Sequence, residues 1–426
     1  MSHFTTETYR AKREVINFSK MLVPDDNRTE QRFVSDMIYG LLRSGSVTLK
    51  DIGAALNEDI RIINTIDRLS QHLSKPLSKQ IAMDYRKRTM SKLDHDPIFL
   101  VDDSEIIKPY GKAFEALGRV RDGSDPKHDI KPGYMVTEIV GVTKREKQPV
   151  SLYSHIHSSA EEGYVSANQV LYEGLNSVLS HIRADQRPTF IFDRGYDMND
   201  LFQFMYNHEK KPYYIIRLTQ KRKLKVGKHW ISAPALAAAR KGKIRTELTF
   251  WDASHSRMVN QTVYISHLKT RITAGGFPVF LVLVYGLSDT PMMLATNRPI
   301  YNKLDVQKIV WHYMSRWRIE EYFRFKKQHF DFENIRVRSL QSLNNLNQLL
   351  GYAIALVGIL ADKKSYSAFT GRLIVNAKAL RDNVSFFYYQ IALGLMNTLA
   401  YAREGIDRWF KRRREPQRQL SFLHIV

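Results

Sequence analysis

The sequence contains no cysteine. This absence excludes disulfide bonds, thiolate catalysis and cysteine-ligated zinc, and it fits a reducing compartment. The first residues lack the apolar stretch of a signal peptide. The longest apolar run, residues 349–360, has about 12 residues, whereas a transmembrane helix needs about 20. We therefore expect a cytoplasmic protein without membrane contact, with a buried core helix at residues 349–360.

Acidic residues are scarce relative to basic ones. The chain has 43 Asp and Glu against 65 Lys and Arg, a formal net charge of +22 and an isoelectric point near 9.8. A field of this sign attracts polyanions, of which nucleic acid is the commonest large one. An anionic membrane surface is the rival partner, but neither end carries a lipidation signal or a Lys-rich amphipathic anchor. The charge therefore indicates a protein that binds nucleic acid.

The N-terminal part, residues 1–92, has the patterning of helices. Within it, residues 47–73 read as two short amphipathic helices with a break at Asn57-Glu58. Such a pair is typical of a DNA-binding helix-turn-helix, although any helical hairpin gives the same pattern. We predict a helical DNA-binding domain here and leave the plain hairpin as the alternative.

The pattern of apolar residues changes after residue 93. Short apolar runs predict strands at 97–102, 133–141, 149–154, 188–193 and 211–218, with a helix near 167–182. Strands, a helix and strands again indicate a mixed α/β sheet. We assign residues 93–218 and 301–370 to this core, 219–300 to a strand-rich insertion and 371–426 to a helical, basic C-terminal region. Its basic run, 411–414, is by default a solvated tail.

Two acids follow hydrophobic strands in the predicted core. Asp102 ends the run IFLVD, and Asp193 ends TFIFD and precedes Arg194-Gly195-Tyr196. Ligand sites in open α/β sheets cluster at carboxyl strand ends, where a rigid sheet holds the side chains. An Asp that leaves a strand is also an ordinary turn residue. The tight turn after Asp193 favours a site at that position.

A predicted helix over residues 309–330 carries a strip of polar residues on one face. They are spaced by 3, 4 and 7, which a 3.6-residue period places in line: Tyr313, Arg316, Glu320 and Lys327. Apolar neighbours such as Trp317 and Phe323 indicate that the helix is substantially buried. Buried charges need partners such as metal ions or phosphates, whereas a solvated, salt-bridged face is the alternative.

At these residues the chain resembles a known family. Tyr-x2-Arg-x3-Glu-x6-Lys is the YREK signature of bacterial DDE transposases of the insertion-sequence-four type. The family's second acid lies in an Asp-Arg-Gly-Phe/Tyr block, which residues 193–196 match. Its first acid has Ser or Thr two residues later, as Asp102 has Ser104, so we choose Asp102 over Asp103. The resemblance covers about residues 98–338.

The resemblance implies a ribonuclease-H-like catalytic core with a strand-rich insertion before the third acid. It implies that Asp102, Asp193 and Glu320 are catalytic and hold Mg²⁺, for which Mn²⁺ substitutes. Oxygen ligands of this kind suit Mg²⁺, and paired divalent ions suit phosphodiester cleavage. DNA would contact the following residues: Tyr313, Arg316, Lys327, Arg194 and Trp317. Trp230 and Trp251 are further candidates for stacking on a flipped base, and the alternative for all three tryptophans is a packing role.

The function implied is that of a cut-and-paste transposase. It would bind terminal inverted repeats of an insertion sequence, cleave the DNA at its ends and join the 3′ ends to target DNA. The resemblance also implies a homodimer in the synaptic complex, in a bacterial nucleoid. The alternatives are a domesticated, non-transposing DNA-binding protein and a ribonuclease-H-like nuclease. The basic run 221–223 is either a solvated loop or a phosphate contact.

Overall fold

The computed structural model describes residues 2–23, 27–123, 125–127, 129–252, 257–273, 275–363, 367–378 and 387–410. The α-helices are α1 Ser2–Lys20, α2 Arg28–Ser44, α3 Leu49–Leu56, α4 Ile62–Leu73, α5 Lys79–Met90, α6 Ala167–Leu179, α7 Asn199–Asn207, α8 Ala233–Ala238, α9 Lys303–Met314, α10 Trp317–His329, α11 Leu340–Ala361, α12 Ala368–Asn376 and α13 Phe387–Ala400. The strands are β1 Ile98–Ile107, β2 Gly118–Arg121, β3 Ile130–Val142, β4 Pro149–His157, β5 Thr189–Phe192, β6 Tyr213–Arg217, β7 Lys223–Val226, β8 His229–Ser232, β9 Ile244–Asp252, β10 Arg257–Ile272, β11 Phe277–Tyr285 and β12 Met292–Thr296. Short 3₁₀ helices η1, η2 and η3 cover Arg194–Tyr196, Phe332–Asn334 and Asp407–Trp409.

The described strands join in one mixed sheet. Its order is β2-β3-β1-β5-β6-β12-β11-β10-β7-β8, with β4 paired to β3 and β9 to β10. The central strands β1, β5 and β6 run parallel, and the other pairings are antiparallel. Every residue of β5 is buried, as expected of a parallel strand covered on both faces. The predicted mixed α/β class is therefore confirmed.

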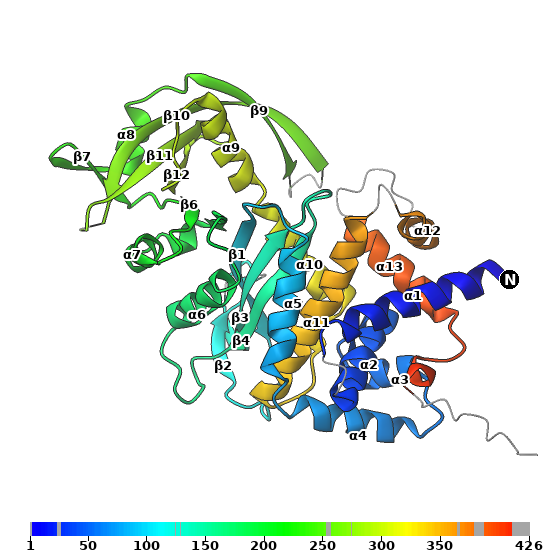
Figure 1. Cartoon of the computed structure of the whole chain (residues 1–426). Coiled ribbons are helices and arrows are strands. Elements are labelled where there is room, and N and C mark those ends of the chain that lie inside the picture. The colour runs from blue at the N-terminus through cyan, green and yellow to red at the C-terminus, as the bar shows by residue number, and fades with distance from the viewer. Residues whose placement is uncertain are drawn as a thin grey trace, which may run out of the picture.

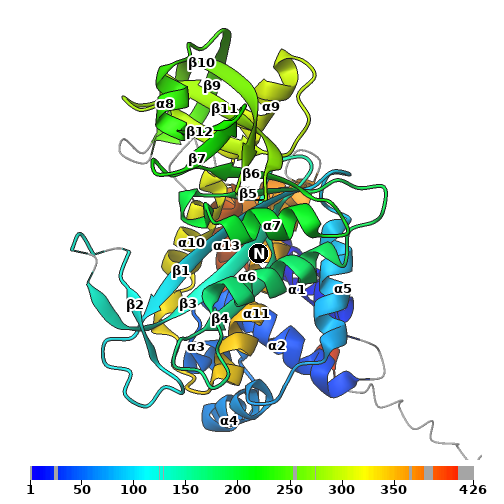
Figure 2. The same ribbon diagram turned by 90° about the vertical axis from the view of Figure 1, so that its left-hand side faces the viewer.

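Helices cover both faces of the central strands (Figures 1 and 2). α6 and α7 lie on one face, and α10 and α11 lie on the other. The strands β7 to β12 with α8 extend the sheet away from this core, and α9 leads back to it (Figure 1). The sheet thus continues from the core into the segment that the sequence marked as an insertion. Where the domain boundaries fall stays a prediction.

α11 is longer than the apolar run predicted from sequence. Its 22 residues would suffice to cross a membrane by length and composition, but 83% of its apolar window is buried inside the protein. It packs on β4 and against α2 and α13. The predicted buried core helix is present, and its polar first turns explain why the sequence showed only its second half.

The N-terminal helices do not pack by themselves. α1 and α2 contact α13, and α2 and α4 contact α11, so the two ends of the chain share one helical body (Figure 1). α3 and α4 correspond to the predicted helical pair, and Asn57 takes a left-handed conformation at the break (φ 46°). On α4, Arg68 is held by Asp36 and Glu58. The structure shows the helices, and their DNA-binding role stays a prediction.

Two predicted boundaries were wrong. β1 does not end at Asp102, because β3 pairs with it antiparallel as far as Ile107 after the parallel partner β5 has ended. The helix predicted over 309–330 is broken between α9 and α10. The Ser315 hydroxyl bonds to the His312 carbonyl, and the backbone N–H of Arg316 bonds to the Tyr313 carbonyl. These i to i+3 bonds tighten the turn and end α9.

Candidate active site

The strand register brings Asp102 and Asp193 together. β1 and β5 pair in parallel, with Val101 opposite Phe192 as the last pair. Asp102 and Asp193 are the next residue on each chain, and neighbouring strands lie only about 4.8 Å apart. The carboxylates of Asp102 and Asp193 therefore lie side by side at the carboxyl end of this parallel pair, as the sequence indicated.

A tight turn holds the Asp193 carboxylate. Asp193 caps the 3₁₀ helix η1, and its Oδ1 accepts a hydrogen bond of 2.6 Å from the backbone N–H of Gly195. A Cβ atom at position 195 would lie 3.0 Å from that same oxygen, so glycine leaves room for the carboxylate. This contact explains the glycine of the Asp-Arg-Gly-Tyr block in physical terms.

Glu320 joins the pair through Arg316. Arg316 lies at the start of α10, where one guanidinium nitrogen is 3.4 Å from Asp102 Oδ2 and the other donates to Glu320 Oε1. The Glu320 side chain is 51% exposed, while that of Asp102 is 21% exposed. Asp102 is thus held in the sheet, and Glu320 can turn about its side-chain bonds. The structure brings the three predicted acids to one place.

The charge balance of this cluster favours an added cation. Burial raises the pKa of Asp102 to about 7; Arg316 opposes the rise, and the neighbouring carboxylate of Asp193 adds to it. Adjacent carboxylates repel each other in this way unless positive charge lies between them. Arg316 supplies one such charge, and it touches only Asp102 and Glu320 among the three acids.

The residues fit divalent metal ions in chemical type. Carboxylate oxygens are the ligands that hard divalent cations prefer. Among the residues that the structure describes, no three His, Asp or Glu side chains are grouped closely enough to hold an ion as they stand. Arg316 lies between Asp102 and Glu320, so the metal-bound arrangement requires that arginine to turn aside. When bound, divalent ions would supply a Lewis acid and an activated oxygen nucleophile.

Asp103 is engaged elsewhere. It alternates with Asp102 along β1, and its Oδ1 accepts a 2.6 Å hydrogen bond from the Thr137 hydroxyl of β3. Burial raises its pKa, and this hydrogen bond opposes the rise. Arg316, in contrast, forms its salt bridge with Asp102. The two aspartates thus have different partners, and the choice of Asp102 over Asp103 stays a prediction.

The other polar residues of the predicted strip separate. Tyr313 lies in the last turn of α9, is 5% exposed and lies close to Arg217 of β6. Lys327 lies farther along α10, where Glu105 and Glu333 hold its ammonium at 2.9 and 3.1 Å. Tyr313 and Arg316 therefore belong to the acidic cluster, whereas Lys327 is tied to the far end of β1.

A basic pocket of about 410 Å³ lies beside Asp193. Its lining includes Arg194, Arg217 and Lys221. Arg217 also lies close to Tyr313, so this pocket adjoins the acidic cluster. The sequence had indicated Arg194 and Lys221 as candidate DNA contacts, but Arg217 was missed. Within the basic run 221–223, Arg222 is tied by its Nε to Asp197 at 2.8 Å. Lys221 and Lys223 are exposed, as a phosphate contact requires.

The tryptophans named from the sequence lie in different places. Trp317 begins α10, is partly buried and packs under the Arg318 guanidinium at 5.0 Å. Trp230 is 45% exposed on β8 and lines a neighbouring pocket with Lys221 and Lys223. The side chain of Trp251 lies outside the described residues. Of these side chains, Trp230 offers the more open stacking surface.

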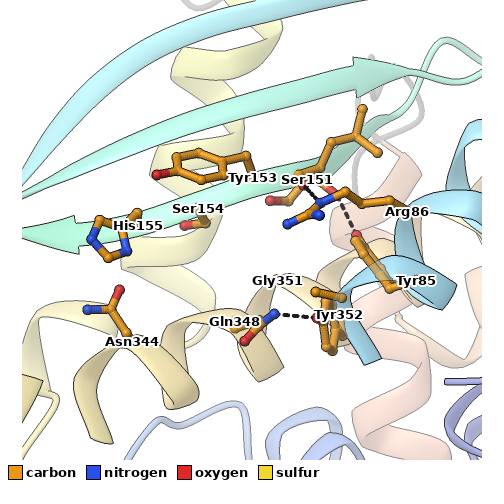
Figure 3. A pocket seen from close by; sticks show the side chains of 12 residues that line it. Tyr85, Arg86, Ser151, Tyr153, Ser154, His155, Asn344, Gln348, Gly351 and Tyr352 are labelled. Atoms are coloured by element: carbon orange, nitrogen blue, oxygen red, sulfur yellow. Dashed lines mark hydrogen bonds between the residues drawn. The ribbon is translucent and has the colours of Figure 1, made fainter. Parts of the chain in front are cut away.

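A polar pocket of about 190 Å³ lies elsewhere, at the outer edge of β4 (Figure 3). Tyr85 and Arg86 of α5 bond there to the carbonyls of Ser151 and Leu152. These bonds satisfy backbone groups that an edge strand leaves open. None of the three acids lines this pocket, so we assign it to the packing of α5 on the sheet.

Comparison with known proteins gives one match to a family model. Residues 160–357, a little under half of the chain, match the family model described as "Transposase DDE domain". The matched segment contains Asp193 and Glu320, whereas Asp102 lies before it, so Asp102 rests on geometry. No curated protein matches the chain.

A solved structure is similar in outline. It is a piggyBac transposase synaptic complex with hairpin DNA, with a TM-score of 0.43 and 8% identity, covering 91% of this chain and 75% of that one.

Proposed function

We propose that this chain, a DDE transposase, binds the terminal inverted repeats of an insertion sequence, cleaves the DNA at its ends and joins the 3′ ends to target DNA. The observation that carries the proposal is the meeting of Asp102, Asp193 and Glu320. Two come from adjacent parallel strands, and the third is linked to them by Arg316. Such a cluster beside a basic pocket suits phosphodiester chemistry.

The proposed core is ribonuclease-H-like. Its support is the arrangement β4-β3-β1-β5-β6, in which β3 is antiparallel to its neighbours and β1, β5 and β6 are parallel. The first two acids lie on the strands, and the third lies on a helix packed against them. The strand-rich segment 219–300 comes between the second and third acids, as the resemblance to the YREK-signature group implies.

The acidic and the basic residues of the site would have separate roles. Asp102, Asp193 and Glu320 would hold Mg²⁺, or Mn²⁺ in its place, and the ions would supply Lewis-acid stabilisation and an activated oxygen nucleophile. Arg194, Arg217 and Lys221 would hold the phosphates on either side of the cut. Arginine suits this task because its planar group can bind a phosphate through two donors.

Tyr313 and Arg316 act within the acidic cluster. Tyr313 is buried, so it would position Arg217 rather than grip DNA by itself. Arg316 would turn from the carboxylates to the DNA backbone once divalent ions neutralise the acids. Lys327, held by two glutamates, would contact DNA farther from the cut.

Cleavage of supercoiled plasmid that carries the element's own ends tests the proposal. With Mg²⁺ or Mn²⁺, the wild type is expected to excise the fragment, whereas Glu320→Ala binds the ends without cutting them. The physical reason is that removing one ligand oxygen group disables the metal site and leaves the DNA-binding surface intact. A Glu320→Ala protein that cuts as fast as wild type would remove Glu320 from the proposed site.

The same assay separates the alternative functions. If wild type and Glu320→Ala both bind the ends and neither cuts, the chain is a domesticated DNA-binding protein. If the wild type cuts and never joins 3′ ends to a target, it is a nuclease of the same fold. The resemblance also favours a homodimer in the DNA-bound state and a bacterial nucleoid location, which we include in the proposal.

A further inference from the structure

A second basic surface lies outside the acidic cluster. A groove of about 610 Å³ is lined by residues 47–51 at the start of α3, by Ser70 and Ser74 at the end of α4, and by the segment 334–342 before and within α11. We call it the α3 groove. Lys50, Arg336 and Arg338 line it and are exposed. No salt bridge joins any of the three to a described residue.

One acidic residue, Asp51, lines the α3 groove, and its carboxylate already accepts hydrogen bonds from within the protein. Asp51 accepts hydrogen bonds from Ser46 at 2.8 Å and Thr48 at 2.6 Å, which lower its pKa. Lys50 and Arg336 also act on Asp51, which shows that the two walls face each other closely. Three cations against one hydrogen-bonded carboxylate leave a positive surface, with hydroxyl groups from both walls beside it.

The walls of the α3 groove are rigidly connected. The backbone N–H of Val47 donates to the Phe330 carbonyl at 3.1 Å, so the start of α3 is fixed to the end of α10. The backbone N–H of Glu115 donates to the Arg338 carbonyl, and the Glu115 carboxylate accepts from the N–H of Leu340, which fixes the opposite wall. Asn345 of α11 bonds to the carbonyls at the end of α4. The cations are therefore presented on a preformed surface.

The α3 groove is joined to the end of α10, the helix that carries Glu320, through the hydrogen bond from Val47 to Phe330. Phe330, the residue after α10, lies ten positions beyond Glu320, a rise of about 15 Å. That is less than one turn of duplex DNA, about 34 Å. A duplex with its cleavage point at the acids would therefore still be in reach of the groove.

From these observations we propose that the α3 groove binds backbone phosphates of the same DNA duplex that the acids cut, through Lys50, Arg336 and Arg338. The inference rests on the proposed function for its choice of DNA as the polyanion. Phosphate contacts of this kind set register and affinity without reading sequence. The groove would hold the duplex at a fixed distance from the cut.

Fluorescence anisotropy with a labelled duplex and metal withheld tests the inference. The full-length triple variant Lys50→Ala/Arg336→Ala/Arg338→Ala is compared with wild type over a range of salt concentrations. Each lost phosphate contact lowers the slope of log affinity against log salt by about 0.9, so the slope should fall by about 2 to 3. Affinity at low salt should fall by about tenfold or more, equally for element ends and random duplex.

Two control proteins keep the result interpretable. The matched variant Lys79→Ala/Lys87→Ala/Arg88→Ala removes the same charge from the exposed face of α5 and should keep the wild-type slope. The variant Lys50→Arg/Arg336→Lys/Arg338→Lys keeps the charge in the α3 groove and should also keep it. An unchanged slope in the alanine triple, or an equal loss in the α5 triple, overturns the inference.

Failure of the inference and failure of the proposed function give different results. If wild type cleaves plasmid and the alanine triple binds DNA with the wild-type slope, the α3 groove is not a DNA site and the cleavage function stands. If the slope falls and wild type never cleaves, the groove is a DNA site on a protein that does not cut.

Discussion

Replacing Asp102 by Asn is expected to lower the rate of DNA strand cleavage by about 10³-fold or more. The amide removes the negative charge that a divalent ion needs, and metal stabilisation of several kcal/mol corresponds to a loss of this size. The neighbouring variant Asp103→Asn should stay within about tenfold of wild type. Its Oδ1 accepts a hydrogen bond from Thr137, and the amide oxygen of Asn can accept the same bond. Single-turnover cleavage rates measure both.

The two variants serve as controls for each other. They differ by one position on the same strand and carry the same chemical change, so a general loss of folding would affect both. DNA binding without metal should be kept in each. If Asp103→Asn loses cleavage and Asp102→Asn keeps it, the first acid has been assigned to the wrong residue, and the pairing of Asp102 with Asp193 has no catalytic meaning.

Replacing Lys326 by Met is expected to destabilise the fold by about 3–5 kcal/mol. The Lys326 ammonium lies 3.1 Å from Glu138, and both side chains are fully buried. Glu138 also accepts hydrogen bonds from the hydroxyls of Ser151 and Ser154. Losing the lysine leaves a buried carboxylate without a counter-charge, which is the costly case for a buried pair. Urea denaturation followed by circular dichroism measures the change.

The adjacent lysine is the matched control. Lys327 forms its salt bridges at a partly exposed position, where such pairs contribute about 1 kcal/mol or less. Lys327→Met should therefore cost far less than Lys326→Met. Adding Glu138→Gln to Lys326→Met should recover much of the stability, because the neutral amide still bonds to the serines. Equal losses for the two lysine variants would show that the buried pair does not have this role.

The Lys326–Glu138 pair also helps to position Glu320, because it holds α10 on the sheet. Lys326 is on α10 and Glu138 is on β3, so their contact fixes the helix against the sheet. Glu320 lies less than two turns earlier on that helix, and Asp102 lies on β1, the next strand after β3. A loosened α10 should therefore also lower cleavage, since the third acid would lose its alignment with the first two.

Local patterns were enough to locate Asp193 and Glu320. Asp193 follows three apolar residues, Phe190 to Phe192, in a fully buried strand, and Gly195 marks the tight turn that its carboxylate caps. Glu320 lies in a spaced motif with Arg316, and the two side chains do meet. The parallel pairing of β1 and β5 then makes Asp102 the neighbour of Asp193. These features depend on residues close in sequence or on one strand pairing.

Features formed by segments far apart in the chain could not be predicted from the sequence. The break at Ser315 depends on one hydroxyl bonding to the backbone, which helical periodicity does not reveal. The Lys326–Glu138 pair joins residues 188 positions apart. A glutamate inside the apolar strand β3 was the available signal, since a buried acid requires a partner. The α3 groove combines three separate segments, so its cations could not be grouped in advance.

Anomalous diffraction from Mn²⁺ would test the central claim most directly. Crystals of the full-length chain bound to a duplex with the element's end would be soaked with Mn²⁺. We expect anomalous density in contact with the carboxylates of Asp102, Asp193 and Glu320, with the Arg316 guanidinium turned away from Glu320 toward the DNA. Density at other carboxylates, such as Asp103 or Glu105, with none at these three, would contradict the assignment of this cluster as the metal-dependent cleavage site.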